Sequence, residues 1–275
     1  MSDKQKKILI IGAGNMGYAI IEGIIDSGFS SPKNLIVVEK NTERAKSLRK
    51  KKINVVCSID DLHSKDFLQI SFVLIAVKPN DVNDVLTQLK GKISSTALVS
   101  SIAAGIKIKS IEGVFGKKQP ICRIMPNTPS QIGFGVNCIS FNKNIKKSHK
   151  DLLHKMFQVL GETFILEEKY FDAVTAISGS GPAYFCYLVE SMIQSGISLG
   201  FDPKLAHDLV INTGLGTLLL LKKKNITPKV LRESVTSPKG TTHAAISYFE
   251  KHKLNSVIVN GIQKAKDRSV ELGKQ

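Results

Sequence analysis

The sequence lacks the residue patterns that hold metal ions or form disulfides. Its 275 residues include four cysteines and six histidines, but no Cys-x-x-Cys pair, no His-Glu-x-x-His segment and no cysteine–histidine cluster with ligand spacing. These absences argue against zinc sites and against a disulfide-stapled secreted domain. We therefore expect a protein that uses no metal and lies in the reducing environment of the cytoplasm.

Aromatic residues are scarce. They make up 6% of the chain, and tryptophan is absent. The net charge of +16 is of the kind that accompanies nucleic-acid binding. However, the lysines are dispersed and no aromatic residues alternate with the basic runs, so we expect no stacking surface and no nucleic-acid partner. The charge instead favours anionic small molecules such as a dinucleotide and a carboxylate.

Long apolar runs are also missing. No apolar stretch precedes the first predicted strand, so we expect no secretory leader. The longest charge-free stretch, Ala173 to Val189, has Ser178-Gly-Ser-Gly-Pro182 at its centre and would not form one continuous helix. We therefore expect no membrane span.

What the sequence does contain is a glycine-rich turn between a buried strand and a helix. Ile8 to Ile11 reads as the strand, and isoleucines at helical spacing follow the turn. In such a turn the first glycine allows the sharp bend, the second lets backbone N–H groups approach a pyrophosphate, and the third lets the helix pack closely on the strand. The helix N-terminus adds a partial positive charge. The residues predicted to bind the dinucleotide here are Gly12, Gly14, Asn15, Met16 and Gly17.

A residue that could bind the ribose follows the second apolar run, Leu35 to Val38. Glu39 lies about 20 residues after the glycine turn, where an acidic side chain accepts a hydrogen bond from the ribose 2′-OH of NAD. Lys40 and Arg44 follow, and a cation there would instead bind the 2′-phosphate of NADP. The choice between NAD and NADP stays open, as does the reading of these charges as an ordinary solvated turn.

Strand-like and helix-like segments alternate through the first part of the chain. This alternation predicts an α/β fold with an N-terminal Rossmann-type, doubly wound parallel sheet. The predicted strands are 8–11, 35–38, 54–57, 72–77, 97–102 and 121–125, with 136–141 as one further candidate.

Helical periodicity dominates beyond residue 161, apart from a brief extended piece at 163–166. We therefore predict a dinucleotide-binding Rossmann domain over 1–161 and an all-α C-terminal substrate and dimerisation domain over 162–275. The helix from Leu205 to Leu221 is apolar around much of its circumference and must be buried on most sides. We expect it to pack against a second subunit, which makes the protein a homo-oligomer.

Three predicted strands end in turns of small or uncharged residues, at 76–79, 101–105 and 123–129. Ligands of open parallel sheets bind at the carboxyl ends of the strands, so three such turns together predict a nicotinamide pocket, although any one could be an ordinary turn. Lys78 is either a catalytic acid or a ribose or amide contact, and we favour the contact. The candidate cofactor contacts are Ala76, Val77, Lys78, Pro79, Ala103 and Asn127.

Two bends interrupt the helical part, at Ser178-Gly-Ser-Gly-Pro182 and at Val235 to His243. Both are expected to break helices and to offer hydroxyls and free N–H groups. A helix N-terminus rimmed with Ser and Thr binds a carboxylate through backbone donors and the helix dipole. The alternative is plain N-capping by Ser237 or Thr241.

These motifs together resemble the pyrroline-5-carboxylate reductase family over essentially the full length of the chain. The most specific segments are Asp172-Ala-Val-Thr-Ala-Ile-Ser-Gly-Ser-Gly-Pro-Ala183 and Val235-Thr-Ser-Pro-Lys-Gly-Thr-Thr242. The glycine turn, Ala76-Val-Lys-Pro79 and Arg123-Ile-Met-Pro-Asn-Thr-Pro129 complete the resemblance.

The resemblance implies reduction of 1-pyrroline-5-carboxylate to L-proline by NADH or NADPH, and dimers that often assemble further. It also implies that Thr242 lies near the ring nitrogen and that the 237–242 turn holds the substrate carboxylate. Thr242 and Ser180 are the candidate catalytic residues. The candidate substrate-binding residues are Ser237, Lys239, Gly240, Thr241 and Thr242.

The chain departs from the family pattern at one position of this turn. The family usually reads Ser-Pro-Gly-Gly-Thr-Thr, and Lys239 occupies the first of those glycine positions. If the backbone there needs positive φ, lysine is strained; otherwise its ammonium group helps to hold an anion. Substrate affinity is the property that this difference affects.

No acid–base pair is needed, because a protonated cyclic imine is already an electrophile and the protein has to align it with the nicotinamide. The proton comes from solvent or through the Thr242 hydroxyl. A hydroxy-acid dehydrogenase of similar two-domain architecture is the alternative, but it needs a Lys or His proton donor, and the bends offer only Lys239. We expect the glycine turn and the bend near residue 240 to face one crevice that a second subunit completes.

Overall fold

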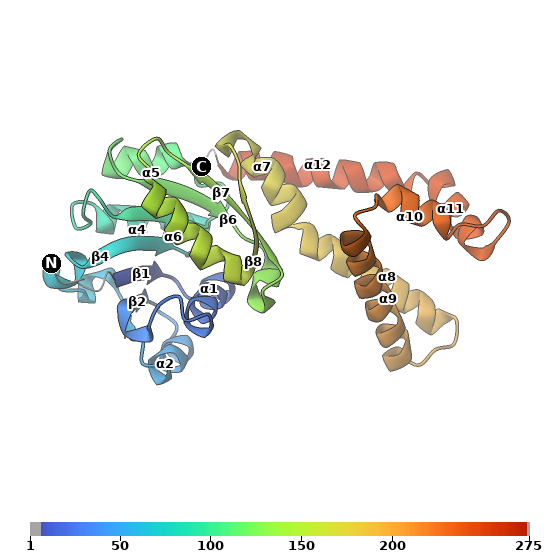
Figure 1. Ribbon diagram of the computed structural model, residues 1–275, viewed down its shortest axis with the longest axis horizontal. Helices are drawn as coiled ribbons and strands as arrows, with labels where there is room; N and C mark the ends of the chain where they lie inside the picture. The colour runs from blue at the N-terminus through green and yellow to red at the C-terminus, as the bar shows by residue number, and fades with distance from the viewer. Residues whose placement is uncertain (1–6, 274–275) are drawn as a thin grey trace. The chain divides into compact units, whose positions relative to one another are not determined.

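The computed structural model describes residues 7–273, which divide into two compact units. The first comprises residues 7–180 together with 265–273, and the second comprises residues 181–264. Figure 1 shows the elements in chain order. None of the helices in these described residues is long and apolar enough to cross a membrane.

The first unit is built on an eight-stranded sheet in the order β3-β2-β1-β4-β5-β6-β7-β8. β1 lies between β2 and β4 and is parallel to both, so the strand order reverses there as in a Rossmann fold. The predicted Rossmann-type fold is confirmed. The strands are β1 (Lys7–Ile11), β2 (Leu35–Val38), β3 (Asn54–Val56), β4 (Ile70–Ile75), β5 (Leu98–Ser101), β6 (Ile121–Met125), β7 (Gly135–Phe141) and β8 (Gly161–Ile165).

Helices cover both faces of this sheet, because successive side chains of a strand point to opposite faces. Ile8 and Ile10 join one apolar core, whereas Leu9 and Ile11 join the other. The first core is completed by α1 (Asn15–Asp26), α2 (Thr42–Lys50) and α6 (Lys147–Phe157). The second is completed by α3 (Ser64–Phe67), α4 (Val82–Leu89) and α5 (Ile108–Phe115).

The last two strands differ from the expected arrangement. β7 is antiparallel to β6, because the connection between them holds only the short 3-10 turn η4 (Thr128–Ile132), and a parallel return needs a longer crossover. The extended piece expected in the helical domain is β8, which pairs parallel to β7. The first compact unit therefore continues past residue 161.

The second unit consists of helices, as the helical periodicity beyond residue 161 predicts. Their starts follow from capping: the Asp202 side chain accepts from the N–H groups of Lys204 and Leu205, and Thr227 caps the next helix. The helices are α8 (Gly181–Ser198), α9 (Pro203–Lys224), α10 (Pro228–Ser234) and α11 (Thr241–Lys251), followed by the first part of α12 (Leu254–Leu272).

This helical unit buries few of its own side chains. Ala206 is the buried residue of α9, and α10 and α11 contain none. Leu209, Leu215 and Leu218 of α9 are 46%, 56% and 51% exposed in the single chain. An apolar surface of this extent is typical of a contact between subunits.

Candidate functional site

The glycine turn after β1 has the geometry that dinucleotide binding needs. Gly12 has φ +93°, and a Cβ there would lie 2.8 Å from the Ala76 carbonyl oxygen. A Cβ on Gly17 would lie 2.3 Å from the Gly12 carbonyl oxygen, so only glycine lets α1 start this close to the turn. Gly14 faces open space and is the N-cap of α1, with no side-chain hydrogen bond to the first N–H groups. The start of α1 is therefore open to a phosphate.

The turn opens on a cavity of about 570 Å³ at the carboxyl ends of β1 to β4. Seven predicted cofactor residues line it: Gly12, Gly14, Glu39, Lys40, Ala76, Val77 and Lys78. The lining does not include Asn15, Met16, Gly17, Pro79, Ala103 or Asn127. The cavity thus corresponds to the half of the fold that holds the adenosine part of a dinucleotide.

Sequence reasoning missed part of this lining. Cys57 and Ser58 follow β3, and Asp84 and Gln88 lie on α4. The rule that ligands bind beyond the carboxyl ends of the strands would have found the first two. The α4 residues carry no motif, so no sequence signal marks them.

Glu39 connects the glycine turn with the start of α2. One carboxylate oxygen accepts from the N–H of Ala13 at 2.6 Å, and the other accepts from the N–H of Asn41 at 2.7 Å. The Asn41 side chain caps α2 by accepting from the N–H of Arg44 at 2.9 Å. The Arg44 guanidinium in turn lies 4.4 Å from the centre of the Tyr18 ring on α1. Glu39 therefore fixes the shape of the cavity, and each of its oxygens keeps a lone pair for a ribose hydroxyl.

We expect Glu39→Ala to weaken NADH binding about tenfold more than NADPH binding, because a hydrogen bond to a charged acceptor contributes about 1.5 kcal/mol or more. The 2′-phosphate of NADPH has no 2′-hydroxyl proton to donate to Glu39. Removal of the Glu39 carboxylate also removes a negative charge that repels the phosphate. The measurement is the dissociation constant of each reduced coenzyme from nicotinamide fluorescence. Glu43→Ala is the control, since that exposed side chain of α2 pairs with Lys46 on the same helix. An equal loss for both coenzymes would contradict the ribose contact.

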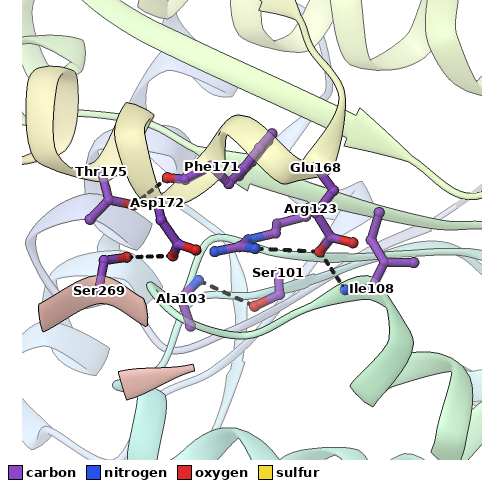
Figure 2. Close-up of polar contacts among 9 residues, drawn as sticks. All are labelled: Ser101, Ala103, Ile108, Arg123, Glu168, Phe171, Asp172, Thr175 and Ser269. Carbon is purple, nitrogen blue, oxygen red and sulfur yellow. Dashed lines mark hydrogen bonds and ion pairs between the residues drawn. The ribbon is translucent and has the colours of Figure 1, made fainter. Parts of the chain in front are cut away.

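Beyond β5 and β6, a buried polar cluster lies beside the second half of the fold (Figure 2). The Arg123 guanidinium, 3% exposed, lies 3.3 Å from Glu168 Oε1 and 4.8 Å from the centre of the Phe171 ring. Burial lowers the pKa of Arg123, and Glu168 opposes that shift. The Ser269 hydroxyl donates to Asp172 at 2.7 Å, and the Ala103 N–H donates to the Ser101 hydroxyl at 3.2 Å. In the sequence, Arg123 is the first residue of the 123–129 motif, but no role was predicted for it.

Asn127, a predicted cofactor contact, makes three hydrogen bonds within the protein. Its amide nitrogen donates to the Ser178 carbonyl oxygen at 3.2 Å and to the Ser178 hydroxyl at 3.3 Å. Its amide oxygen accepts from the N–H of Val136 at 2.8 Å. Asn127 thus holds the loop after β6 against the 178–182 segment.

The 178–182 segment does not break the helix in the expected way. α7 (Phe171–Val174) continues into the π-helical turn Thr175–Gly179, and α8 begins at Gly181 after a single bend at Ser180. The Ser180 N–H donates to the Thr175 carbonyl oxygen at 2.8 Å, so this N–H of the segment is bonded within the helix. A π-turn inside a helix often marks a functional site.

The predicted substrate turn is well formed in the second unit. The Gly240 N–H donates to the Ser237 carbonyl oxygen at 3.0 Å. Gly240 is the N-cap of α11 and makes no side-chain capping bond. The N-cap position is thus occupied by Gly240 and not by Ser237 or Thr241, which favours first N–H groups of α11 that are available to a carboxylate.

Lys239 has φ +59°, so this position does require the left-handed conformation that glycine tolerates and lysine does not. We expect Lys239→Gly to raise the free energy of unfolding by about 0.5 to 1 kcal/mol, with part of the relief offset by the greater freedom of glycine in the unfolded chain. Thermal unfolding would show a midpoint raised by about 2 to 4 °C. The matched variant is Lys253→Gly, because Lys253 also has positive φ, +55°, but lies outside the turn. It should show the same relief of backbone strain without a change in the substrate site.

The same substitution tests the ammonium group. If Lys239 helps to hold the carboxylate, Lys239→Gly raises the KM for the substrate while Lys253→Gly leaves it unchanged. A KM that does not move in Lys239→Gly removes the ammonium group from the binding site.

Comparisons with known proteins agree with this geometry. A family model described as pyrroline-5-carboxylate reductase dimerisation matches residues 168–272, and one described as NADP oxidoreductase coenzyme F420-dependent matches residues 7–105. Pyrroline-5-carboxylate reductase 1 of Bacillus subtilis is 33% identical over 98% of this chain and 90% of its own length.

Two solved structures are similar over nearly the whole chain. Pyrroline carboxylate reductase of Plasmodium falciparum with NADP bound is 28% identical, with a TM-score of 0.87, over 99% of this chain and 100% of that chain. A pyrroline-5-carboxylate reductase from Coxiella burnetii is 30% identical, with a TM-score of 0.87, over 98% of this chain and 100% of that chain.

Proposed function

The chain belongs to the pyrroline-5-carboxylate reductase family, and we propose that it reduces 1-pyrroline-5-carboxylate to L-proline through the residues described above. It is an NAD(P)H-dependent oxidoreductase that self-associates through its helical part. The relatives favour this activity over the alternative of a hydroxy-acid dehydrogenase. The observation that carries the proposal is that one chain of this family holds both a glycine turn open to a pyrophosphate and a helix start open to a carboxylate.

The coenzyme fits the first unit, because a Cβ on Gly12 or Gly17 would fill the cradle at the start of α1. The N–H groups at the start of α1 bind the pyrophosphate, and Glu39, Lys40 and Arg44 face the adenosine end of the cavity. We assign Pro79, Ala103 and the amide oxygen of Asn127 to the nicotinamide half, and Lys78, which lines the cavity, to a ribose or amide contact of the coenzyme. When bound, NADH or NADPH supplies the hydride that adds to the imine carbon.

The second unit binds and orients the substrate. The open N–H groups of α11, with Ser237 and Thr241, hold the carboxylate by hydrogen bonds and the helix dipole. Thr242 brings a hydroxyl to the ring, and the proton that the nitrogen gains comes from solvent or through Thr242. Ser180, which lies in the first unit, stays the second candidate catalytic residue. Alignment of this kind supplies of order 7 to 11 kcal/mol of the barrier reduction at best.

Residues 1–161 serve mainly the coenzyme, and residues 162–275 serve the substrate and the dimer, with dimers assembling further. The free thiols of Cys57, Cys122, Cys138 and Cys186 support a cytoplasmic location.

The test mixes purified protein with 1-pyrroline-5-carboxylate and either NADH or NADPH. We expect the reduced-coenzyme absorbance to fall while L-proline accumulates in equal amount. A parallel reaction with 2-hydroxy acids and NAD+ or NADP+ should show no turnover. No oxidation of either coenzyme by the imine would overturn the proposal.

A further inference from the structure

The loop between β5 and α5, residues 102–107, lies at the carboxyl edge of the half of the sheet that faces the nicotinamide in a Rossmann fold. It carries Ala103, a predicted coenzyme contact. At its start, the Ala103 N–H donates to the Ser101 hydroxyl at 3.2 Å, and Ala103 is 5% exposed. In its middle, Gly105 has φ +80°. Its shape therefore depends on what holds its other end.

That other end is held by a residue distant in sequence. Lys107, the N-cap of α5, makes no side-chain capping bond. The N–H of Ile108 instead donates to Glu168 Oε1 at 2.7 Å. The same oxygen lies 3.3 Å from Arg123 Nη1 on β6, so one carboxylate ties the end of the loop to the sheet (Figure 2).

The last turn of α12 forms a third support. A Cβ on Gly105 would lie 3.2 Å from the backbone nitrogen of Gly273, so this turn contacts the loop backbone directly. Ser269 fastens the turn to α7 by donating to Asp172 Oδ1 at 2.7 Å. Asp172 lies one helical turn after Glu168, and Figure 2 shows both carboxylates beside the Arg123 guanidinium.

A stabilising role does not account for the Arg123–Glu168 pair. The Arg123 side chain is 3% exposed, and burial disfavours its charged form. Glu168 is 29% exposed, so the desolvation of Arg123 is the main effect that offsets the attraction, and the pair adds little net stability compared with apolar side chains of similar size. What such a pair does supply is a defined geometry, here that of the loop end and the start of α5.

We propose that Arg123 and Glu168, supported by the Ser269–Asp172 contact at the end of α12, are positioning residues that hold the 102–107 loop in place against the nicotinamide half of the coenzyme. They act through the loop and do not touch the reacting atoms. The inference rests on the proposed function, since the nicotinamide matters only if the enzyme transfers hydride.

The test compares ligands that fill one half or both halves of the coenzyme site. Isothermal titration measures NADP+ against 2′,5′-ADP, or NAD+ against ADP, whichever coenzyme the wild type binds more tightly. We expect Glu168→Ala to weaken the whole coenzyme about tenfold and to lower kcat about 100-fold, because a small misplacement of reacting groups has effects of that size. Binding of the adenosine fragment should change less than about twofold.

Glu168→Ala leaves Arg123 buried without its partner and can unfold the chain. Two milder variants keep the test decisive. Glu168→Gln retains an acceptor for the Ile108 N–H and should recover most of the coenzyme affinity, and Ser269→Ala should give a smaller loss of the same kind. The matched control is Glu22→Gln, which removes a carboxylate from the Lys51 pair of the same unit.

The outcomes separate the two proposals. If the wild type binds neither coenzyme, the proposed function fails. If the wild type binds and turns over normally, two results would overturn the positioning role. One is that Glu168→Gln and Ser269→Ala weaken binding of the whole coenzyme and of the fragment equally, and the other is that they weaken binding of neither.

Discussion

Gly17→Ala should weaken coenzyme binding about 100-fold, the largest loss expected from a single methyl group in this chain. The added Cβ would lie 2.3 Å from the Gly12 carbonyl oxygen and 3.2 Å from the Ala76 Cβ. Either α1 moves away from the strand or the turn opens, and overpacking of this kind has an energy of about 1 to 3 kcal/mol before the misplaced N–H groups are counted. Titration followed by nicotinamide fluorescence measures the loss.

Two other glycines separate crowding from phosphate contact. Gly14 has no atom within 4 Å of its would-be Cβ, so Gly14→Ala should fold normally and still weaken binding, because the methyl group occupies the space that the pyrophosphate needs. Gly113 is equally uncrowded on α5, and Gly113→Ala should be slightly more stable with unchanged affinity. Normal binding by Gly17→Ala would refute the assignment of the glycine turn.

Thr242→Val should lower kcat about 100-fold while the dissociation constant of the coenzyme changes less than about twofold. Valine keeps the shape of threonine but removes the hydroxyl that we propose as a proton route to the ring nitrogen, and proton transfer by a positioned group contributes about 100-fold or more to a rate. Steady-state kinetics and coenzyme titration on the same sample measure the two effects separately.

The control is Thr87→Val on α4, whose hydroxyl donates to the Asn83 carbonyl oxygen at an exposed position outside the cavity lining. That variant should retain full turnover. Unchanged turnover in Thr242→Val would remove Thr242 from the site.

The sequence predicted most of the first unit because its signals are local. Apolar runs marked the central strands, and the glycine turn marked the start of α1. The direction of β7 was missed, since it depends on the short connection through η4 and not on composition. β8 was assigned to the helical domain because an edge strand is only partly buried and lacks the apolar run of a central strand.

The site was predictable at positions where the backbone conformation or close packing calls for one residue type, glycine. Positive φ at Lys239 and the close approach at Gly17 follow from the glycine pattern of the turns. The Arg123 cluster was not predictable, because Glu168, Asp172 and Ser269 are ordinary surface residue types that acquire a role only when the chain brings them together. The π-turn before Ser180 likewise depends on the backbone and has no composition of its own.

The exposed leucines of α9 have a consequence for how the enzyme behaves in a test tube. A unit whose helices bury almost nothing within one chain draws its stability from association, so its melting temperature and its specific activity depend on protein concentration. Dilution below the dissociation constant of the dimer should abolish the catalytic activity. Assays at nanomolar and micromolar protein would then disagree, and added coenzyme would narrow the difference only if it binds the dimer more tightly than the monomer.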